Sequence, residues 1–165
     1  MQPVSERLRS EGLLKADSAD APWDERSSPP HLQLLLLCDR GALEGGLSIA
    51  LDVRPDEAIG PLCTAIGGGA RRLRILDVRD RPVPELRILH GELEEGWEVE
   101  DLSALVHNLN DLFKADPRAR AVAVLGEWED ALQLWCVPKD RLRELLRADY
   151  FAPINRDQLV SIAEC

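Results

Sequence analysis

Three side chains whose types could form a nucleophilic triad, Ser103, His107 and Asp111, follow one another at intervals of four residues. Serine, histidine and aspartate are the residues that hydrolases combine as nucleophile, general base and orienting carboxylate. On a helix, however, this spacing turns all three to the same side and leaves no room for a substrate carbonyl among them. We therefore expect a solvated stripe with a His107–Asp111 pair, and we predict no catalytic residue.

His90 is the second candidate, because Gly91 and an acidic segment follow it directly. Together with Glu92, Glu94 and Glu95 it could contribute to a metal or acid–base site. The ligand spacings that are typical of zinc and calcium sites do not occur around it. We expect a surface histidine of raised basicity, keep His90 only as a weak ligand candidate, and predict neither a metal nor a cofactor.

The glycines of the segment GGGARR, at 67–72, are typical of a phosphate loop, but their context is not. A phosphate loop follows a strand and begins a helix, so that the N–H groups of the helix face the anion. Here the glycines follow a predicted helix and precede a predicted strand. We interpret them as the C-cap of that helix and a turn.

The sequence LRIL occurs twice, at 73–76 and at 86–89, and Arg74 and Arg87 hold the same position in the two copies. Other arginines gather around this repeat. The other arginines of this hairpin are Arg71, Arg72, Arg79 and Arg81. The segment 92–101 then carries six carboxylates, with Trp97 among them. One interpretation is a solvated sheet face. The other is a charge-complementary surface for a protein partner or a second copy of the chain.

Two of the four tryptophans, Trp128 and Trp135, lie in the segment GEWEDALQLWC. A hairpin that turns on residues 129–130 would place both on one face, with Val124 opposite Trp135 and the Trp135 ring over Gly126. We expect Trp135 in the core. Trp128, at the tip, is either core or a half-exposed contact for a partner. Because Glu-Asp is a poor type I′ pair, a longer loop with another register stays open.

Residues 1–30 are predicted to be a flexible N-terminal tail, since the segment DSADAPWDERSSPP is polar and rich in proline and serine. A short helix is expected from Val4. Trp23 is the one bulky apolar residue of this polar segment. It would either dock on its own domain or anchor a partner.

The elements that must position these residues are predicted to form a single α+β domain over residues 31–165. The order strand, strand, helix recurs three times in the pattern of apolar and turn-forming residues. The expected strands are 31–39, 47–54, 73–76, 86–89 and the two arms of 120–137. The expected helices lie within 55–66, with a regular part from Pro61, and at 102–113, 138–147 and after Asn155, which should cap the last one. We predict a mixed or mainly antiparallel sheet with helices mainly on one face.

The composition limits the partners. A formal net charge of −10 over 165 residues opposes nucleic-acid binding, and no aromatic residue interleaves the arginines. The longest apolar run is too short to span a bilayer, and the first residues lack the apolar region of a signal peptide. The four cysteines form no C-x-x-C pair, which is typical of a reduced, cytoplasmic protein. The excess of arginine over lysine indicates a GC-rich, bacterial genome.

These observations favour a small acidic cytosolic protein-interaction module, such as an adaptor, chaperone or regulator, without catalytic activity. Its expected partner is another protein or a second copy of the chain, and neither a membrane nor a nucleic acid is expected. The candidate contact residues are Trp23 in the tail and, on the surface, Trp97, Trp128, Arg72, Arg74 and Arg87. The alternatives are a small enzyme with a histidine–carboxylate site and, third, a nucleic-acid binder that uses the arginine-rich hairpin.

Overall fold

The computed structural model describes residues 3–15, 27–80 and 82–165, and these residues form an α+β fold, as predicted. The helices are α1 (Val4–Ser10), α2 (Pro30–Asp39), α3 (Pro55–Ile66), α4 (Leu102–Leu112), α5 (Lys139–Arg147) and α6 (Arg156–Ala163), with a 3₁₀ helix η1 (Gly68–Arg72) after α3. The strands are β1 (Gly46–Ala50), β2 (Arg74–Arg79), β3 (Glu85–His90), β4 (Leu93–Glu98), β5 (Ala121–Trp128) and β6 (Ala131–Val137). They pair antiparallel into two sheets rather than one: a central sheet, β1-β6-β5, and an outer sheet, β2-β3-β4.

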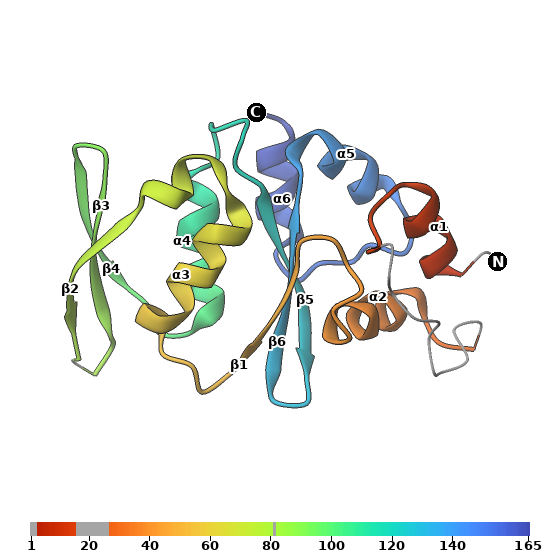
Figure 1. The fold of residues 1–165 in the computed structure, drawn as a ribbon, viewed down its shortest axis with the longest axis horizontal. Helices are drawn as coiled ribbons and strands as arrows, with labels where there is room; N and C mark the ends of the chain where they lie inside the picture. Colours follow the sequence, from red (N-terminus) through yellow and green to blue (C-terminus); the bar gives the residue numbers. More distant parts are fainter. Residues whose placement is uncertain (1–2, 16–26, 81) are drawn as a thin grey trace.

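Four layers follow one another across the molecule (Figure 1): the outer sheet, the helix pair α3 and α4, the central sheet, and the helices α1, α2, α5 and α6. The inter-sheet cluster fills the space between the two sheets and includes Leu86, Leu109 and Leu134. The helix-side cluster, on the other face of the central sheet, includes Leu34 and Trp135. Helices therefore cover one face of the outer sheet, as predicted, but both faces of the central sheet.

The β5–β6 hairpin turns on Glu129 and Asp130, as predicted. Both residues adopt the left-handed backbone of a type I′ turn, with φ of 49° and 62°. The predicted register is confirmed for residues 126–128. A bulge after Val124 then shifts the pairing by one residue, so that Val124 lies opposite Leu134 instead of the predicted tryptophan.

Trp135 is fully buried in the helix-side cluster, which confirms its predicted place in the core. Its indole Nε1 donates to the Glu44 carbonyl at 2.8 Å, and its ring meets Phe151 edge-on with 5.7 Å between centroids. The ring does not cover Gly126, contrary to expectation. The nearest atom to a Cβ built on Gly126 is Leu35 Cδ1 of α2, at 3.5 Å.

The prediction of a buried strand at 31–39 is wrong, because this segment forms α2. Its buried side chains recur with the period of a helix: Gln33, Leu34, Leu37 and Cys38. Leucines also fill half-buried positions between them, so the sequence shows a continuous apolar run without helical periodicity. The cue for a helix was Pro30 at its first position.

The acidic segment after His90 contains β4, which was not predicted. The turn between β3 and β4 has two residues, and Gly91 takes the positive φ, 61°, that favours glycine. Trp97 lies opposite Leu86 and points into the inter-sheet cluster. One buried tryptophan and a complete ladder with β3 thus hold an otherwise exposed, acidic strand in the sheet.

The start of α3 and the capping of α6 differ from expectation. α3 begins at Pro55 rather than at Pro61, which lies inside the helix. α6 begins after Asn155, as predicted, but the Asn155 side chain does not cap it. Ile154 is 71% exposed, so it does not form the hydrophobic staple that its spacing from the buried Leu159 suggested.

Part of the segment predicted to be a flexible tail packs on the rest of the protein. The helix expected from Val4 is confirmed as α1, and Val4 and Leu8 are buried in the helix-side cluster. Residues 3–15 thus belong to the folded structure. Trp23 lies outside the described residues, so its two possible roles remain predictions.

Leu8→Ala tests whether α1 is part of the folded unit. Leu8 is 0% exposed, and truncation of a buried leucine leaves a cavity that lowers the free energy of unfolding by about 2–5 kcal/mol. Chemical denaturation measures this loss, and Arg9→Ala, at an exposed position of the same helix, should change stability by no more than about 0.5 kcal/mol. Equal stability of the two variants would contradict the packing of α1.

Candidate functional site

Ser103, His107 and Asp111 lie on the exposed side of α4, as predicted. His107 Nε2 is 3.3 Å from Asp111 Oδ2, and the two side chains are 60% and 59% exposed. Gln158 Nε2 donates to the other oxygen of Asp111 at 3.2 Å. The three residues therefore form a solvated stripe rather than a triad within a pocket.

His90 ends β3 and turns inward. Its ring meets Phe113 edge-on with 4.9 Å between centroids, and its Nε2 is 3.2 Å from the place that a Cβ on Gly69 would take. The neighbouring Glu94 contacts an arginine instead, and Glu95 contacts a tryptophan. Residues 3–15, 27–80 and 82–165 contain no group of three or more His, Cys, Asp or Glu suited to a metal ion.

Gly67 is the C-cap of α3, as predicted, and the residues after it form η1 and bind a carboxylate of the protein itself. Gly67 and Gly68 have φ of 72° and 55°. The N–H of Gly69 donates to Asp116 Oδ2 at 2.8 Å, and the N–H of Arg118 donates to Oδ1 at 2.9 Å. These bonds hold the pKa of Asp116 below its ordinary value. The Asp116 carboxylate thus takes the place that an external anion would have at these glycines.

The predicted surface residues are dispersed. Arg72 belongs to η1 and lines a hollow of about 360 Å³ beside the glycine segment. Trp97 is only 8% exposed, so the prediction of a surface contact there is wrong; its Nε1 donates to a neighbouring glutamate at 2.9 Å. Trp128 is half-buried at the end of β5. Only Arg74 and Arg87 come together, on the outer sheet, where β2 and β3 are antiparallel neighbours as the LRIL repeat predicted.

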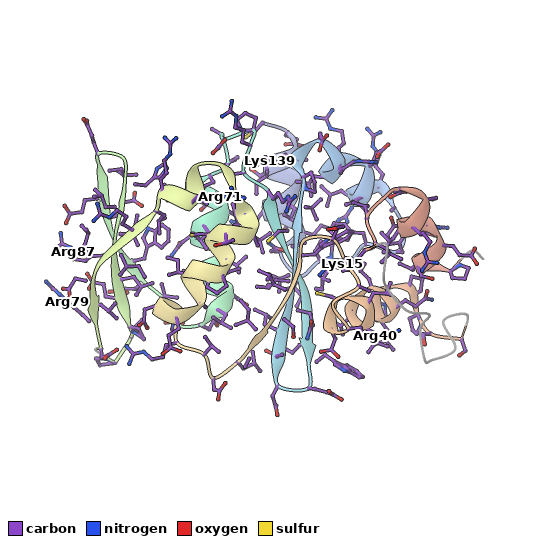
Figure 2. The ribbon with its side chains drawn as sticks, viewed as in Figure 1. Lys15, Arg40, Arg71, Arg79, Arg87 and Lys139 are labelled. Carbon is purple, nitrogen blue, oxygen red and sulfur yellow. The ribbon has the colours of Figure 1, made fainter. Side chains whose placement is uncertain are left out.

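The outer face, defined as the face of the outer sheet turned away from α3 and α4, carries most of the charged side chains of strands β2, β3 and β4. Inward-pointing side chains of the three strands pack in or against the inter-sheet cluster: Ile75, Val78, Leu86, Ile88 and Trp97. Alternation and pairing place the others in three rows, given in the order β2, β3, β4: Arg74, Leu89, Glu94; then Asp77, Arg87, Gly96; then Arg79, Glu85, Glu98. Figure 2 shows Arg79 and Arg87 on this side, and none of the described elements covers it.

The two edges of the outer face carry opposite charge. β2 brings Arg74 and Arg79 to the first and third rows, and β4 brings glutamates to the same rows. Arg87 Nη2 binds Glu94 Oε1 at 2.5 Å across the strands. Among the described residues, Arg74 and Glu98 form no ion pair. One edge of the face thus carries two arginines and one aspartate, Asp77, which Arg79 contacts at 3.3 Å, and the other edge carries two glutamates, so the two edges have opposite net charge.

Asp77, Glu85 and Leu89, which complete this face, were not singled out from the sequence, whereas Glu94 and Glu98 belong to the acidic segment 92–101 that was. The available signal was the alternation in β3, where the buried Leu86 and Ile88 separate Glu85, Arg87 and Leu89. The acidic strand β4 gave no such signal, because its glutamates do not favour a strand.

A second polar group that was not predicted closes the free edge of β5. Asn110 accepts from the Val122 N–H at 2.8 Å and donates to the Val122 carbonyl at 2.9 Å. Asn155 accepts from the Val124 N–H at 2.9 Å, and the Ile154 N–H donates to the Val124 carbonyl at 2.8 Å. These bonds satisfy edge groups that would otherwise be open to another strand.

Comparison with known proteins gives no match: no protein-family model, no curated protein and no solved structure is similar to the chain. Within the part of the chain that the structure describes, no helix has both the length and the apolar character needed to cross a membrane.

The buried thiols should resist modification. Burial raises the pKa of Cys38 and Cys136 to about 12 and that of Cys63 to about 11, so their reactive thiolate forms are scarce near neutral pH. A thiol reagent should modify only the exposed Cys165 of the native protein and all four thiols after unfolding. Cys165→Ser should abolish the native reaction. Fast modification of a second thiol would contradict this burial.

Asp116→Asn should destabilise the protein at neutral pH. The folded state lowers the pKa of Asp116, so the ionised carboxylate stabilises the fold above its ordinary pKa, and this contribution is lost as the pH falls through the lowered value. The difference in unfolding free energy between the two proteins should therefore shrink in acid. Urea denaturation across pH measures it, with Glu144→Gln, an exposed carboxylate on α5, as control. A difference that is independent of pH would refute the assignment.

Proposed function

We propose that this protein is a small protein-interaction module, an adaptor, chaperone or regulator, that binds a protein partner through the outer face. The observation that carries the proposal is the set of three rows, in which a positive edge and a negative edge flank a central strand. Such a pattern matches a partner that presents the reverse order of charge, and it steers both encounter and register.

The positions of the charges favour binding on the face rather than at the strand edges. Charged side chains along the edge strands of an open sheet discourage the addition of another strand. Leucines lie among the charges, at the exposed Leu76 on β2 and the partly buried Leu89 on β3. They give a partner apolar area to cover, as in interfaces whose core excludes water.

The alternatives are less well supported. An arginine face for nucleic acid would have to tolerate Glu85, Glu94 and Glu98 on the same surface, and these carboxylates repel phosphates. A histidine–carboxylate enzyme site would need His90 or His107 in a pocket with other titrating groups. His90 instead packs on Phe113, and His107 is exposed. The three buried free thiols suit a reducing compartment, and we place the protein in the cytoplasm.

Capture from a lysate of the source organism tests the proposal with three tagged baits. They are the unaltered chain, a variant with both Arg74→Glu and Arg79→Glu (the sheet variant), and a control. The control pair, Arg9→Glu and Arg147→Glu, makes the same change of net charge in the helical layer on the other side of the molecule. A protein, or an untagged copy of the chain, should bind the unaltered bait and the control but not the sheet variant. Its binding is then measured with the purified pair.

The proposal fails if no protein binds the unaltered bait, or if every captured protein binds the sheet variant equally well. In the second case the contact lies elsewhere on the molecule.

A further inference from the structure

We propose that the outer face binds the outer face of a second copy of this chain, about a two-fold axis parallel to the strands. This inference rests on the proposed function, because it names the partner of the same surface. It follows from the order of charge within the rows, which makes the surface complementary to itself in one orientation.

A two-fold axis parallel to the strands reverses the order of the strands and keeps the order of the rows. It therefore places β2 of one copy over β4 of the other. In the first row Arg74 meets Glu94 of the second copy, and the Leu89 side chains of the two copies meet at the axis. In the third row Arg79 meets Glu98 of the second copy. By symmetry each of the two ion-pair contacts occurs twice, whereas the Leu89 contact, which lies at the axis, occurs once.

The other orientations bring like charges together. An axis across the strands would place β2 over β2 and β4 over β4, so that arginines face arginines and glutamates face glutamates. Edge-to-edge pairing of two identical strands, β2 with β2 or β4 with β4, also brings like charges together. Pairing of β2 with β4 of another copy, edge to edge, would be attractive but would not close, and it would grow into chains.

Two charged residues of β3 lie near the proposed axis, and both lean away from it. The Arg87 guanidinium reaches across to Glu94, 2.5 Å away. The Glu85 carboxylate lies over Gly96, since its Oε1 is 3.0 Å from the place that a Cβ on Gly96 would take. The repulsion between equivalent charges at the axis is thereby reduced. Asp77 of the second copy approaches the same space over Gly96, so the second row adds a like-charge contact with Glu85, which the Arg79 beside Asp77 offsets in part.

The size of the face predicts a weak dimer. Three strands of six residues each cover roughly 20 by 14 Å, given about 3.3 Å per residue and about 4.8 Å between strands. This is well below the roughly 800 Å² per partner of a stable interface. Because most of the contacts are exposed ion pairs, the association should be sensitive to salt.

Analytical ultracentrifugation of the full-length purified chain over a wide concentration range tests the inference. The unaltered protein should form dimers and no larger species at about 0.02 M salt, and its affinity should fall by about tenfold or more at about 0.5 M salt. Arg74→Glu with Arg79→Glu, and separately Glu94→Arg with Glu98→Arg, should each remain monomeric. An equal mixture of these two variants should dimerise, because β2 of each variant then faces an oppositely charged β4 of the other.

The control pair Arg9→Glu and Arg147→Glu should dimerise like the unaltered chain, although its net charge equals that of the first variant. Circular dichroism confirms that each variant is folded, and rescue in the mixture shows it independently. A monomeric unaltered chain, growth beyond two copies, or dimers of either single-sign variant would overturn the inference. If the unaltered chain stays monomeric while the outer face captures another protein, the proposed function stands and only the second copy is excluded.

Discussion

The packing of the whole molecule depends on strand β6, whose alternate side chains belong to two hydrophobic clusters. Leu134 points into the inter-sheet cluster and Trp135 into the helix-side cluster, and both are completely buried. A central strand covered on both faces cannot shift by one residue without moving each set of side chains into the other cluster. The hydrogen bond from Trp135 to Glu44 and its ring contact with Phe151 add to this constraint.

The two sheets manage their exposed backbone in different ways. In the central sheet, the side chains of Asn110 and Asn155 bond to the free edge of β5. In the outer sheet, the edge strands β2 and β4 carry arginines and glutamates instead. Charge keeps such an edge soluble and unpaired at a small cost, since the side chains stay hydrated. It also gives the outer sheet a surface that the central sheet does not have.

Where local pattern and tertiary environment agree, the sequence predicts the fold well. The apolar stripe of α4 and the turn at Glu129–Asp130 are examples. The segment 31–39 fails because leucine occupies both its buried and its half-buried positions, which hides the helical period. β4 fails for the opposite reason: a single buried residue, Trp97, and its pairing with β3 hold a strand whose other side chains are exposed. Cross-strand pairing is a long-range property that no local window contains.

The outer face also depends on strand pairing that no local window of sequence contains. Strict alternation from Arg74 would put Leu76 and Val78 on the side of Arg74, with Arg79 on the side of the partly buried Ile75. A bulge between Ile75 and Asp77 inserts one extra residue, and the alternation after it is reversed. Val78 therefore turns inward, and Arg79 joins Arg74 on the outer face. The LRIL repeat could predict that two strands pair, but the self-complementary order of charge exists only because of this one irregular position.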